Sequence, residues 1–261
     1  MLKKLILSAC CVLALAAARD VSAQQPSQMG AAATHYVMFD SAPGAFQLAK
    51  DGVSAKILVD ANDWAGVIRA AKDLGDDVGK VTGKPSEVVT TDKIEAGSVV
   101  VGTIGKSKLI DGLVAAKKID VSKIKGQWES FLIQTVDGSL VVAGSDKRGT
   151  IFGIYDISEK IGVSPWYWWA DVPAKKHDSL FIVPGAFLQG PPKVKYRGIF
   201  INDEEPAFGP WSRAQFGGIN SKMYVHMFEL ILRLKGNYLW PAMWVFSFFR
   251  TSSPKNLFAN S

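Results

Sequence analysis

The chain has 261 residues, of which 48% are hydrophobic and 21% charged, with 24 glycines and 12 prolines. This composition is typical of a globular protein and excludes disordered, collagen-like and coiled-coil classes. The formal net charge is +6, but no basic run is interleaved with aromatic residues, so nucleic acid is not an expected partner. The length is too short for a common domain followed by a complete (β/α)₈ barrel of about 250 residues.

Residues 1–23 are predicted to be a signal peptide. Lys3 and Lys4 precede an apolar run over 5–18, and Val21-Ser22-Ala23 has the small-x-small form that a signal peptidase accepts. The run is too short for a membrane helix, which needs about 20 residues. We therefore expect a secreted or periplasmic protein with no membrane contact after cleavage near Ala23. The alternative is an apolar N-terminal helix of a cytosolic protein.

The mature chain is expected to lack cysteine, because Cys10 and Cys11 both lie in the predicted signal peptide. No disulfide, thiolate metal site or cysteine nucleophile would then remain. The histidines His35 and His177 have no partner at ligand spacing, so neither a metal site nor a cofactor is predicted. Signal removal lowers the net charge from +6 to +4, a mildly basic balance that fits an acidic ligand.

Residues 24–190 are predicted to form an α/β domain, because apolar runs of strand length alternate with helical patterns. Asp137-Gly138 is a hairpin turn signal, Ser145 or Asp146 can cap the third helix, and Gly162 can end it. The expected strands are 36–39, 55–59, 87–90, 98–102, 130–136, 139–143 and 181–183, and the expected helices are 64–75, 109–118 and 148–161.

A second pattern follows residues 184–193, whose glycines and prolines are typical of a linker. It consists of a predicted strand over 196–201, a Gly-, Pro- and Trp-rich loop to Gly218, a helix capped by Asn220, and a strand over 237–243. Strand, helix and strand in this order are one unit of a parallel α/β structure.

Polar and aromatic residues follow the two strands of this unit. Asn202-Asp203-Glu204-Glu205 stands at the carboxyl end of the first strand, and Trp240 and Trp244 stand at the end of the second. Glycoside hydrolysis needs paired carboxylates, and a tryptophan face can stack on a sugar ring. The alternatives are a solvated, helix-capping strand end and tryptophans packed in the core. Parallel strands would bring both sets to one rim, where barrel enzymes bind substrate.

Three other motifs have structural interpretations. The aromatic cluster 165–171 is either a sugar platform or, as we expect, packing between the two parts of the chain. Residues 144–150 lack the terminal Gly-Lys-Ser/Thr of a phosphate loop, so we expect a helix entry there. His226 shares a helical stripe with Lys222, Glu229 and Arg233, which predicts a polar, solvent-facing side of the helix.

Three stretches together resemble glycoside hydrolase family 115, the xylan α-1,2-glucuronidases. The resemblance covers most of the mature chain up to Trp244. It is carried by GSDKRGTIFG (144–153) running on to PWYWWADVP (165–173), by YRGIFINDE (196–204) and by FELILRLKGNYLWPAMW (228–244).

The resemblance implies an N-terminal α/β domain over 24–190, followed by a (β/α)₈ barrel of which residues 191–244 would form the first strands and helix. It also implies an enzyme that removes glucuronic acid, or its 4-O-methyl form, from glucuronoxylan or xylo-oligosaccharides with inversion. Inversion needs a general acid and a general base separated by room for a water. Family members are several times longer, and the resemblance leaves open that they form homodimers.

Carried over by position, Asn202 and Asp203 lie in the family's first-strand motif, which lines the active site, and Trp240 and Trp244 lie in its second-strand motif. We expect Asp203 to be a functional carboxylate, catalytic or holding sugar hydroxyls, and Glu204 to be the weaker catalytic candidate. Asn202 and the two tryptophans are the expected substrate-binding residues.

Residues 245–261 do not match the continuation that the family predicts after Trp244, so our hypothesis is a frameshift or premature stop there. Such a chain would hold the truncated start of a barrel, leave a sheet edge unpaired, and be inactive alone. The alternative from another class is a secreted, non-catalytic carbohydrate-binding or interaction module. A third is another glycosidase of the same two-domain plan, because the first domain of that plan recurs in hexosaminidases and other glucuronidases.

Overall fold

The structure is a computed structural model that describes residues 35–203 and 205–241. The predicted signal peptide, Glu204, Trp244 and residues 245–261 lie outside these described residues. The described chain folds as a larger α/β part followed by a strand–helix–strand unit, which confirms the predicted fold class. The domain boundaries at residues 190 and 244 stay predictions.

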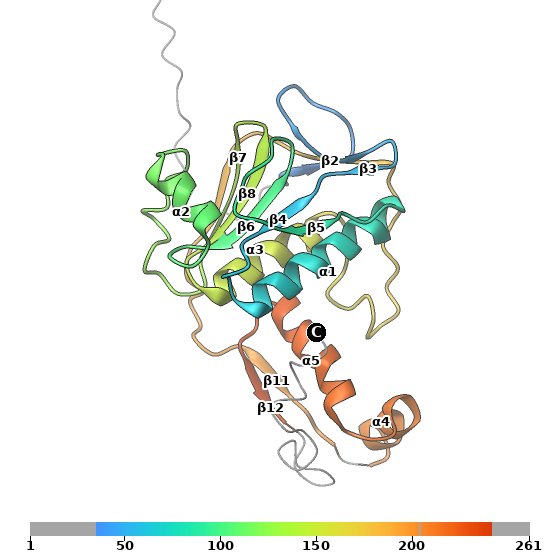
Figure 1. The fold of residues 1–261 in the computed structure, drawn as a ribbon. Coiled ribbons are helices and arrows are strands. Elements are labelled where there is room, and N and C mark those ends of the chain that lie inside the picture. Colours follow the sequence, from blue (N-terminus) through green and yellow to red (C-terminus); the bar gives the residue numbers. More distant parts are fainter. Residues whose placement is uncertain (1–34, 204, 242–261) are drawn as a thin grey trace, which may run out of the picture.

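A six-stranded sheet is the middle layer of the larger part (Figure 1). Strands β4, β5, β6 and β8 run parallel, and β7 pairs antiparallel with both β8 and β10. The central strands are continuous apolar runs because both of their faces are covered. The strands, in their order across the sheet, are β10 (Ala186–Gln189), β7 (Phe131–Val136), β8 (Ser139–Gly144), β6 (Val99–Thr103), β4 (Ile57–Val59) and β5 (Val88–Thr90).

Helices lie on both faces of this sheet. Helices α1 (Ala65–Thr82) and α3 (Lys147–Lys160) pack on the face that presents Val99 and Val101, and α2 (Lys108–Ala115) packs on the face that presents Val100. A second sheet joins the core beneath α1 and α3. Its strands, in order, are β1 (Val37–Met38), β9 (Ser179–Ile182), β2 (Phe46–Lys50) and β3 (Val53–Ser54).

The predicted local signals of this part are confirmed. Asp137 and Gly138 both have positive φ, +47° and +77°, as the tight turn between β7 and β8 requires. The Asp146 carboxylate caps α3 by accepting the Gly149 N–H at 2.7 Å, and Gly162 follows the helix with φ +106°. These features depend on residues close in sequence, which is why the pattern alone predicted them.

Helix α1 is longer than predicted, because Gly75 does not end it. A Cβ on Gly75 would lie 2.5 Å from the carbonyl oxygen of Ser86. The glycine therefore permits close packing of the helix on the loop before β5, and the helix continues to Thr82. Gly83, with φ +82°, is the residue that ends it.

Four elements were not predicted. Strands β2 and β3 were missed, the expected linker contains β10, and the expected loop before Gly218 contains α4 (Phe208–Phe216). Strand β10 pairs with β7 through backbone groups, so the glycines and prolines around it conceal a strand at the edge of the sheet.

The second part is a parallel strand–helix–strand unit, as predicted. Strands β11 (Gly198–Phe200) and β12 (Tyr238–Trp240) pair in parallel, and α5 (Ser221–Arg233) covers the sheet face that presents Ile199 and Leu239. The opposite face leaves Phe200 and Trp240 exposed. Helix α5 begins at its predicted cap, Asn220, and its C-terminal half packs on α3 of the larger part (Figure 1).

We expect Gly75→Ala to destabilise the fold by about 1–3 kcal/mol, because the added methyl meets a backbone carbonyl. Gly112→Ala in α2 is the matched control. A Cβ at Gly112 meets nothing within 4 Å, so this change should stabilise the helix by about 0.5–1 kcal/mol. Chemical denaturation measures both, and a stabilising Gly75→Ala would contradict the packing of α1 on Ser86.

Candidate functional site

The structure brings three of the five predicted site residues to one rim. The pairing places Phe200 opposite Trp240, and the Ile201 N–H donates to the Trp240 carbonyl at 2.9 Å. Asn202 and Asp203 therefore leave β11 at the same edge where Trp240 ends β12, as the parallel arrangement predicted. The other two predicted residues, Glu204 and Trp244, lie outside the described residues.

Asp203 and Asn202 differ in their surroundings. Asp203 is only 2% exposed, whereas the neighbouring Asn202 is exposed. Burying a carboxyl group is costly unless other groups contact it, and Asp203 is in contact with other groups of the chain. A shielded carboxyl beside an exposed amide can combine proton transfer with the binding of sugar hydroxyls.

The Trp240 side chain is partly exposed to solvent on the sheet face that α5 does not cover. It is 47% exposed and meets Phe200, which is 54% exposed, at a centroid distance of 5.6 Å and an interplanar angle of 86°. Within the described residues, Trp240 is therefore not a core tryptophan. An exposed, edge-packed indole of this kind offers an apolar surface to a sugar ring.

The aromatic cluster 165–171 packs between the two parts of the chain, as expected. Trp168 stacks on His226 with a centroid distance of 4.0 Å and an interplanar angle of 8°. Trp169 Nε1 donates to the His226 carbonyl at 3.3 Å and the Tyr167 hydroxyl donates to Glu229 at 3.0 Å. These contacts use the rings for packing against α5, so the structure does not support the sugar-platform alternative.

The prediction of a solvent-facing stripe on α5 is correct for Lys222, which is exposed. It is wrong for His226, Glu229 and Arg233, which contact the larger part. Arg233 is 3% exposed and donates to Asp77 of α1 at 2.7 Å and to Glu229 at 2.8 Å. Its guanidinium also lies 4.6 Å from the centre of the Tyr155 ring. Burial lowers the pKa of Arg233, but its interactions with Asp77, and to a smaller extent with Tyr155 and Glu229, together raise the pKa above its usual value. The stripe is polar because it meets polar residues of the larger part.

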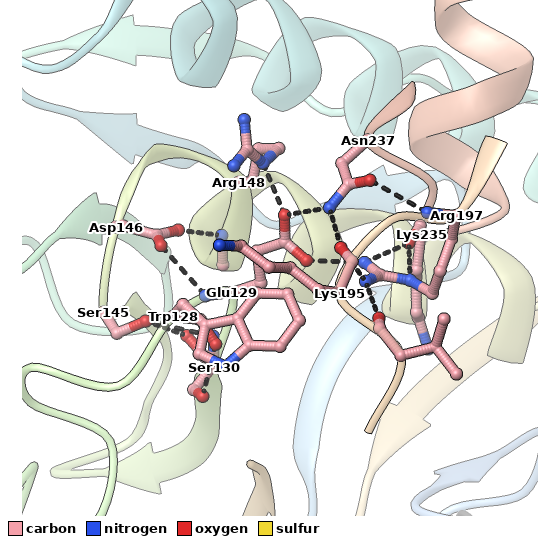
Figure 2. Close-up of polar contacts among 12 residues, drawn as sticks. Trp128, Glu129, Ser130, Ser145, Asp146, Arg148, Lys195, Arg197, Lys235 and Asn237 are labelled. Atoms are coloured by element: carbon pink, nitrogen blue, oxygen red, sulfur yellow. Dashed lines mark hydrogen bonds and ion pairs between the residues drawn. The ribbon is translucent and has the colours of Figure 1, made fainter. Parts of the chain in front are cut away.

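A second set of interface residues, centred on Glu129, was missed entirely (Figure 2). The fully buried Glu129 side chain accepts from Arg148 at 2.6 Å, from Arg197 at 2.5 Å and from Asn237 at 2.8 Å. Burial raises the pKa of the Glu129 carboxyl, but the hydrogen bonds from these three residues outweigh it, and the pKa lies below its usual value. Glu129 is therefore an anion within the protein.

Lys235 and Asp156 of α3 form a further ion pair across the interface, as do Arg69 of α1 and Glu229. The only hint in the sequence is that Arg197, Arg233, Lys235 and Asn237 all lie in the stretches that carry the family resemblance. Their acidic partners lie far away in the sequence, so no local spacing connects them.

The larger part has a cleft of about 430 Å³ at the carboxyl ends of β6 and β8. Ligands bind at this edge in many doubly wound folds. Here the chain's own carboxylates already accept the backbone N–H groups around the helix starts, and residues 144–150 form a helix entry, as predicted. The pairs are Asp63 with Trp64 and Thr103, Asp60 with Lys108, and Asp146 with Gly149.

The described residues contain neither a membrane-spanning helix nor a metal-binding cluster. Within 35–203 and 205–241, no helix combines the length and apolar character needed to cross a bilayer. The same residues contain no group of three His, Cys, Asp or Glu side chains placed to hold a metal ion.

Comparisons with known proteins support the resemblance seen in the motifs. Residues 189–261 match the model of Glycosyl hydrolase family 115. One solved structure is described as a novel family GH115 4-O-methyl-α-glucuronidase, BtGH115A, with specificity for decorated arabinogalactans. It is 36% identical with a TM-score of 0.71, and the match covers 81% of this chain and 28% of that one.

Two other similar structures are more distant. A β-hexosaminidase of Streptomyces plicatus is 14% identical with a TM-score of 0.43, over 77% of this chain and 32% of that one. A chitobiase of Flavobacterium johnsoniae is 12% identical with a TM-score of 0.43, over 78% of this chain and 25% of that one. No curated protein matches the chain.

The match to the family model and the 36% identical structure together confirm the resemblance to glycoside hydrolase family 115. This chain spans 28% of the length of that relative. The match to the family model runs to residue 261, so the prediction that residues 245–261 depart from the family finds no support in it.

We expect His226 to make stability depend on pH. Burial lowers its pKa, outweighing the opposite effect of Glu229, and Arg69 adds to the lowering. The folded state therefore favours the neutral ring. Its stabilising effect is complete above the unfolded pKa of about 6.5 and is lost as the pH falls towards the lower folded pKa.

His226→Phe keeps a ring against Trp168 and cannot titrate. Denaturation at about pH 8 and about pH 5 should show a smaller loss of stability in this variant than in the wild type. An equal loss in both proteins would contradict the role of His226.

Proposed function

We propose that this chain supplies one side of the active site of a glycoside hydrolase that acts on glycans bearing glucuronic acid. The observation that carries the proposal is the rim where buried Asp203 follows β11 and half-exposed Trp240 ends the adjacent parallel strand β12. Its family context comes from the GH115 4-O-methyl-α-glucuronidase with 36% identity.

The specific reaction that we propose is the removal of glucuronic acid or its 4-O-methyl form from glucuronoxylan, with inversion. An inverting hydrolase places a general acid and a general base about 6.5–9.5 Å apart, so that a water fits between the base and the sugar. Asp203 is proposed as one of these two carboxyl groups, with Glu204 as the weaker candidate. Asn202 would hold sugar hydroxyls, and Trp240 and Trp244 would stack on the sugar.

The choice of polymer is open to a direct comparison. The relative's printed specificity is for decorated arabinogalactans, whereas our proposal names xylan. We further propose that residues 1–23 direct secretion or periplasmic export. Removal of the predicted signal peptide lowers the formal net charge from +6 to +4, and this mildly basic balance suits an acidic glycan.

A non-catalytic carbohydrate-binding module is the second candidate, favoured by one observation. Phe200 and Trp240 form an exposed aromatic pair on the sheet face opposite α5, and such a pair can bind sugars without any carboxylate. The two candidates differ in what Asp203 does, because a module needs the aromatic pair but not the acid.

The test is glucuronic acid release from glucuronoxylan and from a decorated arabinogalactan, with oligosaccharide binding measured by calorimetry. Asp203→Asn should reduce release by about 10²–10⁴-fold with a small change in affinity. Trp240→Ala should weaken binding by about threefold to tenfold, since an aromatic contact contributes about 0.5–1.5 kcal/mol. If this chain alone is inactive, release is measured in the 36% identical relative with the matching substitutions.

Release that is unaffected by loss of the Asp203 carboxyl would remove this residue from the catalytic site. Two results together would favour the module: oligosaccharide binding by this chain that depends on Trp240, and glucuronic acid release by the relative that does not require the carboxyl matching Asp203. Faster release from arabinogalactan than from xylan would overturn the proposed polymer and keep the reaction.

A further inference from the structure

Both strands of the second part start beside one carboxylate of the larger part. Arg197 directly precedes β11 and Asn237 directly precedes β12. Each donates a side-chain N–H group to Glu129, Arg197 to Oε2 and Asn237 to Oε1 (Figure 2). The Glu129 side chain therefore joins two residues that are 40 positions apart in the chain.

Arg197 and Asn237 also bind each other, and these bonds form the first rung of the strand pair. The Arg197 N–H donates to Asn237 Oδ1 at 3.0 Å, and the Asn237 N–H donates to the Arg197 carbonyl at 2.7 Å. The Arg197 guanidinium further donates to the Lys235 carbonyl at 2.9 and 2.7 Å. The base of the strand pair is thus held by backbone and side-chain bonds that converge on one anion.

Glu129 is itself held in an unfavourable backbone conformation. Its φ is +51°, a left-handed value that costs an L-residue about 1–2 kcal/mol. The Asp146 carboxylate, which caps α3, accepts the Glu129 N–H at 2.9 Å. In this strained conformation the Glu129 carboxylate points at the starts of both strands. Residues with strained backbones cluster at functional sites.

The first rung fixes the register of β11 against β12, and the register determines which residues lie at the rim. Strands β11 and β12 contain three residues each, so few ladder bonds are available to fix their register. A slip of one residue would exchange the two faces of a strand. Trp240 would then turn towards α5, and Leu239 would take the uncovered face.

We propose that Glu129 is a positioning residue for the candidate active site, through its hold on the register of β11 against β12. The larger part would in this way place Asp203 and Trp240, at the far end of both strands, relative to each other. The functional importance of that rim rests on the function proposed above, whereas the register role does not.

The other two interdomain acids provide a contrast within the same interface. Asp77 binds Arg233 of α5, and Asp156 binds Lys235 in the turn after α5. Within the described residues, neither Asp77 nor Asp156 forms a hydrogen bond or ion pair with Arg197 or Asn237, the residues that precede the two strands. Loss of Asp77 should therefore weaken the interface without changing the strand register.

The test compares Glu129→Gln with the matched control Asp77→Asn. The first readout is amide hydrogen exchange at Ile201, whose N–H donates to the Trp240 carbonyl across the rim. The second is calorimetric affinity for a xylotetraose carrying one 4-O-methyl-glucuronic acid. Both are measured at a temperature where each variant is folded.

We expect both variants to lower the melting temperature. Only Glu129→Gln should also speed exchange at Ile201 and weaken binding, each by at least about tenfold, because small displacements of a site are expensive. Asn237→Ala removes the side-chain bonds from Asn237 to Glu129 and to the Arg197 N–H, although the backbone bond to the Arg197 carbonyl remains. It should speed exchange in the same direction. If Glu129→Gln does not fold, the exchange rate at Ile201 in Asn237→Ala tests the register role in its place.

Equal effects of Glu129→Gln and Asp77→Asn on Ile201 exchange would overturn the positioning role and leave Glu129 a structural ion-pair partner. Unchanged exchange in Asn237→Ala would overturn it too. A wild-type chain that does not bind the oligosaccharide contradicts the proposed function instead, and the exchange comparison still tests the register.

Discussion

The buried Glu129 carboxylate is the constraint on which the arrangement of the two parts depends. An unpaired charge in this position would cost several kcal/mol, and its partners come from α3, from the start of β11 and from the start of β12. Asp77 and Asp156 repeat the pattern, since each is an acid of the larger part that meets a cation of the smaller one. Separation of the parts would remove Arg197 and Asn237 from Glu129, Arg233 from Asp77 and Lys235 from Asp156, and of these partners only Arg148 of α3 would remain. We therefore infer that the two parts form one cooperative structure.

This interface gives the larger part a role that its sheet topology alone does not suggest. A doubly wound sheet commonly binds ligands at the carboxyl ends of its parallel strands, but here Asp60, Asp63 and Asp146 accept the N–H groups at that edge. The outer surfaces of α1 and α3 instead carry the acids Asp77 and Asp156 and the Tyr155 ring, which meet Arg233 of α5 and Lys235 in the turn after it. One structural role of this part is therefore to hold the strand–helix–strand unit.

Local signals in the sequence predicted the hairpin at Asp137-Gly138, the caps of α3 and α5, and the parallel unit that forms the rim. The rim could be predicted because parallel strands must end at a common edge. Long-range partners could not be predicted. The His226–Arg233 stripe has the composition of a solvated face, and only partners far away in the sequence, such as Trp168 and Asp77, make it an interface. Gly75 likewise resembles a helix end until Ser86 is placed against it.

The strand pair divides its chemistry between its two ends. At the amino end, Arg197 and Asn237 are fully engaged by Glu129 and by each other, so this end is built for stability. At the carboxyl end, Trp240 keeps half of its surface open and Asn202 is exposed. Barrel enzymes place substrate-contacting groups at carboxyl strand ends. Because β11 and β12 contain only three residues each, a register that is fixed at their amino ends also holds at their carboxyl ends. An anchor of charged hydrogen bonds at one end is therefore the simplest physical means of keeping an open, adaptable rim in place at the other.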